Sequence, residues 1–236
     1  MMNTIDVQRL ASQAPLASGY RFELIRRDEI RNLIERLTNW YRDISVGAAS
    51  CFLQEEFYSR KVFFDDEPDR ECIVLALKHG PEVVGMFSCE LHSVTRSIYA
   101  GLGVAHPQHR GTRLAQAGMA FVETLAEHLD VGFIFGMATL KHPYAQRAFE
   151  RAGWQLVGIT PGYDREMVAP GVVKRVYEAV YAKVLAGEGL LNPDRTNLTP
   201  RTRALFDSLF EGGTPEVRLE QREYVANGDC QQNERA

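Results

Sequence analysis

Cysteine is scarce in this sequence, and its spacing suggests no metal site. The 236-residue chain has four scattered cysteines, with no CxxC pair and no His/Cys spacing of the kind that holds zinc: Cys51, Cys72, Cys89 and Cys230. Cys72 and Cys89 fall in apolar runs, where a buried, unreactive thiol is the expected state. We therefore predict no metal, and we expect a reduced, cytoplasmic setting.

Long apolar runs and a strong net charge are also missing. No stretch is long and apolar enough to cross a bilayer, and residues 1–20 lack the continuous apolar core of a signal peptide. The net charge of −4 provides no global positive field that would draw the chain to nucleic acid or to an anionic membrane. We accordingly expect neither nucleic acid nor membrane as a partner.

The composition changes twice along the chain and divides it into three regions. Residues 1–19 are polar and broken by Pro15 and Gly19, so they are expected to be an N-terminal lead-in. Residues 20–186 carry dense strand and helix patterns and should form the folded domain. Residues 187–236 are rich in Gly, Pro and amides; they are expected to form an extension with a short helix at 201–210 and a flexible, polar tail.

Strand and helix patterns alternate within the central region. Apolar or alternating runs predict strands at 20–27, 71–78, 82–91, 97–104, 131–140, 154–162 and 172–185. Apolar stripes at helical spacing predict helices after Asp28 and at 51–61, 112–128 and 142–152. The order is β-α-α-β-β-β-α-β-α-β-β, which indicates a mixed α/β layer fold.

One loop combines a turn, a helix start and basic side chains. After the strand that ends at Val104, Pro107 turns the chain and a long helix begins near Gly111. The first turn of a helix has free backbone N–H groups and the positive end of the dipole, so it attracts anions. Gly111 allows close approach of a pyrophosphate, and Arg110 and Arg113 can add charge-assisted contacts. By itself the stretch equally fits an ordinary helix entry with a solvated basic turn.

The loop also resembles a known motif. Gln108-His109-Arg110-Gly111-Thr112-Arg113 resembles the acyl-CoA pyrophosphate loop of the GNAT superfamily of N-acetyltransferases, although Arg113 stands where the family has Gly or Ala. Downstream, residues 142–154 are similar to the family's second CoA-contacting helix. His142 stands there in place of the usual Asn, and Phe149 in place of the usual Tyr. The resemblance spans about residues 20–185 and is sharpest over 98–163.

The resemblance implies a fold and a cofactor. The fold would be a mostly antiparallel central sheet with helices on both faces. Acetyl-CoA, or another acyl-CoA, would be the co-substrate. Its contacts would come from the 97–104 strand, the loop and the second helix: Leu102, Val104, Gln108, His109, Arg110, Gly111, Thr112, Arg113, His142, Tyr144 and Phe149.

The resemblance further implies direct attack of an amine on the thioester, in a ternary complex. The backbone N–H of Val104 or its neighbour would stabilise the oxyanion, beside glycines that favour a bulge. Glu90 is the first choice of general base, because a carboxylate in an apolar strand is costly without a role. Alternatively Glu90 faces solvent, and His92 or Tyr99 serves. Phe149 cannot protonate the leaving thiolate; Tyr144 could, or it is a plain CoA contact or a surface residue.

Three functions follow as alternatives. The first is an N-acyltransferase that acts on a small-molecule amine, with a homodimer as a candidate assembly. The second is a non-catalytic or regulatory acyl-CoA-binding module, which the loss of the Tyr at Phe149 favours. The third is a protein or peptide N-acetyltransferase, with residues 187–236 helping to recruit the acceptor. Fold resemblance carries the cofactor chemistry but does not identify the acceptor.

Overall fold

Seven strands form one sheet, in the spatial order β1-β2-β3-β4-β5-β7-β6. The computed structural model describes residues 6–41, 43–185 and 195–211. The strands are β1 Tyr20–Leu24, β2 Cys72–His79, β3 Glu82–His92, β4 Ser97–Ala105, β5 Phe133–Thr139, β6 Gln155–Ala169 and β7 Val172–Val184. Neighbouring strands are antiparallel except β4 and β5, which run parallel. The prediction of a mostly antiparallel sheet is confirmed.

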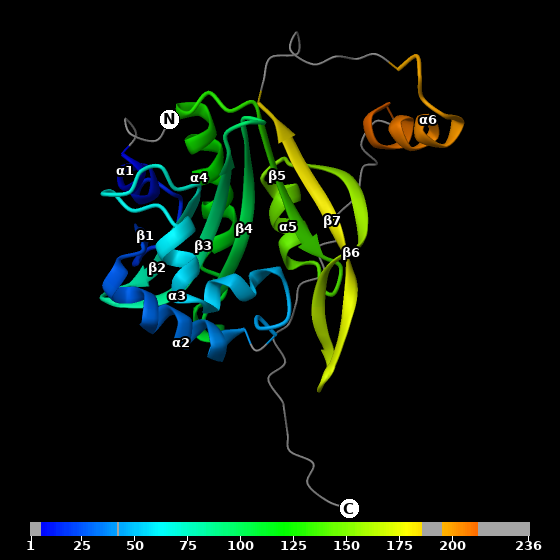
Figure 1. Cartoon of the computed structure of the whole chain (residues 1–236). Helices are drawn as coiled ribbons and strands as arrows, with labels where there is room; N and C mark the ends of the chain where they lie inside the picture. The colour runs from blue at the N-terminus through cyan, green and yellow to red at the C-terminus, as the bar shows by residue number, and fades with distance from the viewer. Residues whose placement is uncertain (1–5, 42, 186–194, 212–236) are drawn as a thin grey trace, which may run out of the picture. The chain divides into compact units, whose positions relative to one another are not determined.

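Helices cover both faces of the sheet, as predicted (Figure 1). On the near face lie α2 Ile30–Trp40 and α3 Glu55–Lys61, with 3₁₀ turns at Arg27–Glu29 and Ala48–Leu53. On the far face lie α4 Leu114–His128 and α5 Tyr144–Arg151. From residue 20 to residue 184 the order of strands and α-helices matches the prediction, except that the helix expected at 51–61 is divided into a 3₁₀ turn and α3.

The core has two parts, one on each side of the sheet. In β2, Ile73, Leu75 and Leu77 pack toward α4, whereas Val74 and Ala76 pack toward α2. Burial on both faces explains why β2 reads as a continuous apolar run rather than an alternating one. Each fully buried Leu or Ile contributes roughly 1.5–3 kcal/mol to folding.

The segment expected to be a lead-in contributes to the core. Val7–Ser12 forms the helix α1, whose N-cap Asp6 accepts a hydrogen bond from the Arg9 N–H at 2.8 Å. Val7, Leu10 and Ala11 lie at helical spacing and are buried in the core on the α4 side. The segment is too short for its periodicity to stand out in the sequence.

The last two strands form a hairpin longer than expected. The predicted strand 154–162 is the first half of β6, which continues to Ala169. Its pairing with β7 shifts register between Pro161 and Arg165, so the Pro161-Gly162 pair produces an irregularity instead of ending the strand.

A second unit, Asp194–Ala236, is separate from Met1–Pro193. Its described residues form α6 Pro200–Phe206, followed by a π-helical turn at Asp207–Glu211, where the sequence predicts a helix at 201–210. The predicted tail after 211 and the segment 187–194 lie outside the described residues. In the part of the chain that the structure describes, no helix is both long enough and apolar enough to span a membrane.

Candidate active site

The two parallel strands in the middle of the sheet separate. β4 and β5 pair from Ser97–Phe133 to Ala100–Gly136, and there their ladder ends, although both strands continue. Figure 1 shows the two strands diverging. Backbone groups along the inner edges of such a fork are left for a ligand or for water to bind.

A bulge accompanies this separation. Phe87 pairs with Gly103 while Cys89 pairs with Ala100, so β4 has an irregularity at Gly101–Leu102. Ser88 fills the gap, since its Oγ accepts a hydrogen bond from the Leu102 N–H at 2.9 Å. The bulge that the glycines predict beside the proposed oxyanion site is therefore present.

The predicted phosphate loop lies at the N-terminus of α4. Gly111 has a φ of +85° and Arg113 a φ of +61°, and α4 begins at Leu114, two residues later than predicted. No side chain caps α4, so the amides of its first turn are available to an anion. Gln108, Arg110, Gly111 and Arg113 are exposed around them.

Further groups in this region fit a nucleotide diphosphate. A Cβ added at Gly111 would meet nothing within 4 Å, so the space above this residue is open. Thr112 is buried, and its Oγ1 has no hydrogen-bond partner in the described structure. His109 is half-buried, and its Nδ1 lies 3.0 Å from the hydroxyl of Tyr20, which fixes the loop against β1. An open surface with free donors suits a phosphate-bearing ligand.

The residues predicted on the second helix separate into two groups. His142 and Tyr144 are exposed, with ring centroids 5.0 Å apart, and Tyr144 begins α5. Phe149 is only 4 % exposed and stacks on Tyr181 at 5.1 Å. It also lies so close to Gly136 that a Cβ there would be 2.5 Å from the Phe149 Cζ. Phe149 therefore holds α5 against β5 beside the fork.

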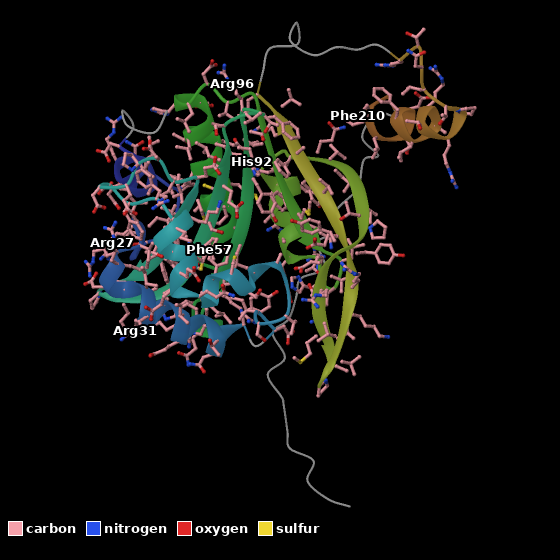
Figure 2. All side chains as sticks on the ribbon, in the orientation of Figure 1. Arg27, Arg31, Phe57, His92, Arg96 and Phe210 are labelled. Atoms are coloured by element: carbon pink, nitrogen blue, oxygen red, sulfur yellow. The ribbon has the colours of Figure 1, made fainter. Side chains whose placement is uncertain are left out.

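Glu90 lies on the α2 side of the sheet, directly across from Tyr99. Its side chain is half-buried. Burial raises the pKa of the Cys51 thiol, and the charge of Glu90 raises it further, so Glu90 faces the 3₁₀ turn Ala48–Leu53. His92, labelled in Figure 2 on the same strand, is exposed, with its ring centroid 6.0 Å from that of Phe135.

Sequence reasoning missed a cluster of carboxylates on this same face. Burial, followed by the charges of Glu166, Asp164, Asp43 and Glu178, raises the pKa of Tyr41 to about 12. The Asp164 Oδ1 accepts a hydrogen bond from the Ala48 N–H at 2.7 Å, which ties the loop after α2 to β6. The signal that would have found Glu178 is a lone Glu inside an apolar strand, the same signal that selected Glu90.

One cation lies beside the cluster. Lys141 follows β5, and its Nζ is 3.4 Å from the Asp43 carboxylate and 3.7 Å from that of Glu166. Lys141 therefore faces the carboxylates rather than the phosphate loop. Among the described residues, no group of three or more His, Cys, Asp or Glu side chains is arranged to hold a metal ion.

Comparisons with known proteins give a family and a fold. The model of the acetyltransferase (GNAT) family matches residues 34–154, just over half of the chain. The spermidine N-acetyltransferase SpeG from Vibrio cholerae, in a mutant form, superimposes with a TM-score of 0.56 at 13 % identity, over 72 % of this chain and 95 % of SpeG.

Other solved structures agree. A probable acetyltransferase gives a TM-score of 0.55 at 16 % identity, over 71 % of this chain and 94 % of its own. The ribosomal protein acetyltransferase RimL gives 0.53 at 11 % identity, over 74 % of this chain and 99 % of its own. At these identities the likeness shows the fold alone. The comparison with curated proteins gives no match.

Proposed function

The chain belongs to the acetyltransferase (GNAT) family, and we propose that it transfers the acetyl group of acetyl-CoA, or another acyl group from its CoA thioester, to a small-molecule amine. The observation that carries the proposal is the fork between β4 and β5 beside the uncapped N-terminus of α4. A fork supplies backbone donors to an extended ligand, and a helix N-terminus supplies donors to its diphosphate.

We propose that three segments hold the CoA thioester. The first turn of α4, with Gln108, His109, Arg110, Gly111, Thr112 and Arg113, would bind the diphosphate. The inner edge of β4 beside Leu102 and Val104, at Gly103 and Ala105, would hydrogen-bond the pantetheine, because the backbone groups of Leu102 and Val104 are turned toward β3. His142 and Tyr144 would contact the CoA at the start of α5, and Phe149 would support α5 from the core.

The reaction we propose is direct attack of the amine on the thioester. The backbone N–H of a neighbour of Val104, Gly103 or Ala105, would donate to the oxygen that becomes negative, which is the contribution an oxyanion hole makes. Val104 itself lies directly across from Met86, in the register in which the His106 N–H donates to the Val84 carbonyl, so its own N–H is turned toward β3. Tyr144 would donate a proton to the departing thiolate. Glu90 is a candidate base, because it is half-buried on the face of β3 that packs against α2.

Of the two classes of acceptor, a small molecule and a protein or peptide, we propose a small molecule. Two structural neighbours are named for different acceptors, spermidine and a ribosomal protein, and neither acceptor transfers to this chain at 13 % and 11 % identity. The buried carboxylates near Tyr41 favour a small cationic acceptor. We also propose a homodimer, which light scattering would test.

The deciding experiment measures binding and turnover together. Calorimetry with CoA reports the diphosphate site, and release of free thiol from acetyl-CoA in the presence of a panel of amines reports catalysis. We expect both binding and release. Binding without thiol release on any amine would support the non-catalytic module instead, and absence of CoA affinity would overturn the proposal altogether.

A further inference from the structure

Glu178 is a buried carboxyl in β7 that has not found a partner. It is 9 % exposed, and its Oε2 has no hydrogen-bond partner among the described residues. It pairs across the sheet with Thr139 of β5 and Thr160 of β6, and the Thr160 Oγ1 is also buried without a partner. Buried polar groups are normally hydrogen-bonded, because leaving one unpaired costs free energy. A polar ligand bound beside Glu178 would supply the missing hydrogen-bond partner.

The side chain of Glu178 faces the α2 side of the sheet. Its neighbours Ala179 and Tyr181 pack in the core on the α4 side, and side chains alternate along a strand. Leu102 and Val104 of β4 pack against the α2 side as well. Glu178 and the proposed oxyanion donor therefore belong to strands that open toward the same face.

Glu178 also lies at the same level along the strands as the proposed oxyanion donor of β4. The ladder between β4 and β5 ends at Ala100–Gly136. Thr139, the partner of Glu178, lies past that end on β5, as Val104 does on β4. Glu178 is thus placed on the wall of the fork, at the level where the thioester of the proposed co-substrate would lie.

The charges around Glu178 are mostly negative. The titratable groups that face it are Asp164, Glu166 and Tyr163 of β6, Tyr41 and Asp43 after α2, Glu90 and Tyr99 across the fork, and Lys141 after β5. Lys141 is paired with Asp43 and Glu166, whereas Asp164 and Glu178 form no ion pair with any residue that the structure describes. Burial, followed by the charges of Asp164 and Glu166, raises the pKa of Glu178 to about 7. A carboxyl in this state can take up and release a proton under neutral conditions.

We propose that this cluster binds a cationic amine as the acceptor, and that Glu178 is the catalytic residue that takes its proton. The inference rests on the proposed function, and it names the substrate class and the base of the same site. Glu178 is preferred to Glu90 because one of its carboxylate oxygens is buried without a hydrogen-bond partner among the described residues, and because it lies beside the other carboxylates. Glu166 also has such an oxygen, but the Lys141 Nζ lies 3.7 Å from it.

In the proposed acyl transfer, the ammonium of the acceptor gives one proton to the Glu178 carboxylate, which frees the lone pair of the nitrogen. A C–N bond forms at the thioester carbonyl, the C–S bond breaks, and its electron pair leaves with sulfur. A second proton of the nitrogen ends on the thiolate, giving an amide and a free thiol, and Glu178 returns its proton to water.

Glu178→Gln tests the base, and Glu82→Gln, a change at an exposed carboxylate at the start of β3, is the matched control. For the wild-type protein we expect kcat/KM to fall below about pH 7, and for Glu178→Gln we expect kcat to fall by about 10²–10⁴-fold with this limb abolished and CoA affinity unchanged. Glu82→Gln should keep the kcat and the pH profile of the wild-type protein. The loss of kcat in Glu178→Gln should exceed the loss in Glu90→Gln, the other candidate base. A Glu178→Gln variant with near-normal kcat, or a larger loss in Glu90→Gln, would overturn the assignment.

Three acceptors of equal chain length test the charge preference: 1,4-diaminobutane, butylamine and 4-aminobutanoate. We expect kcat/KM to fall in that order, by about tenfold or more from the first to the last. An equal or reversed order would overturn the cationic site. If the wild-type protein acetylates an amine but the Glu178→Gln result or the order of acceptors is contrary, only the inference is refuted. If the protein binds CoA but acetylates no amine, the proposed reaction and the inference are both refuted.

Discussion

Replacing Gly111 with glutamate tests the diphosphate site directly. The residue has a φ of +85°, and a side chain there would meet nothing within 4 Å of its Cβ. The substitution therefore costs only the strain of a left-handed L-residue, about 1–2 kcal/mol. That is small beside the roughly 5–15 kcal/mol of stability that a folded domain has. We expect a folded protein whose melting temperature is lower by about 2–8 °C.

The effect on CoA affinity should be much larger than the strain. A carboxylate about 4 Å from one phosphate charge is repelled by about 4 kcal/mol at the effective dielectric constant of a protein surface. Because each 1.4 kcal/mol is about a tenfold change, CoA should bind roughly a thousandfold more weakly. Added salt should narrow the difference, since exposed charges are screened.

Gly111→Ala is the matched control, because it keeps the strain and adds no charge. We expect its melting temperature to fall as much as that of Gly111→Glu, while its CoA affinity stays within about tenfold of wild type. Calorimetry and thermal unfolding of both variants give the comparison. Equal CoA affinity in the two variants would refute the placement of the diphosphate at Gly111.

Three further predictions concern the acceptor face and the second helix. Burial raises the pKa of Glu178 from an ordinary 4.5 to about 7, so the folded state holds this proton more tightly than the unfolded chain. Ionisation of Glu178 therefore destabilises the folded state as the pH rises from about 4.5 through about 7. Glu178→Gln should therefore be more stable than wild type by up to about 3 kcal/mol near pH 8 and about equal near pH 4, by urea unfolding; a gain independent of pH would contradict this. Phe149→Ala should lose about 3–5 kcal/mol, because the ring is 4 % exposed and stacked on Tyr181, and a loss below about 1 kcal/mol would show that the packing has been misjudged. Tyr144→Phe should lower kcat by at least about 10²-fold at unchanged CoA affinity, as stopped assays and calorimetry would show; unchanged kcat removes this hydroxyl from the reaction.

The order of strands and helices was predictable because most elements have strong periodicity. The run 131–140 is almost continuously apolar and forms β5, which is covered from both sides. The helix after Asp28 carries its apolar stripe on the face that packs on the sheet. These patterns depend only on which side chains are buried, and the spacing of apolar residues in the sequence shows that directly.

Elements decided by tertiary contacts were not predictable in the same way. Helix α1 forms because Val7 and Leu10 reach the core, and a six-residue segment shows this too weakly. Strand β6 passes through Pro161-Gly162 because β7 continues to pair with it, although the dipeptide alone favours a turn.

The two halves of the candidate site differ in the same respect. The helix start that carries the proposed diphosphate loop was predictable to within two residues, since a helix start needs only local residues such as Pro107 and Gly111. The proposed acceptor side depends on Glu178, Asp164 and Asp43, which come together only when three distant segments fold. The left-handed Arg113 is likewise visible only in the backbone, and it stands at the place where the family has Gly or Ala.

Helix α1 also shields one border of the sheet. β1 is the outermost strand on its side, and its Leu24 N–H donates to the Gln8 side chain at 2.8 Å. A bare border strand invites pairing with a neighbouring molecule, and a short helix laid over it removes that opportunity. A protein shortened past Ser12 would lose three core side chains and this cover at once. Helix α1 therefore protects the outer edge of β1 from edge-to-edge association, a role that is independent of the proposed reaction.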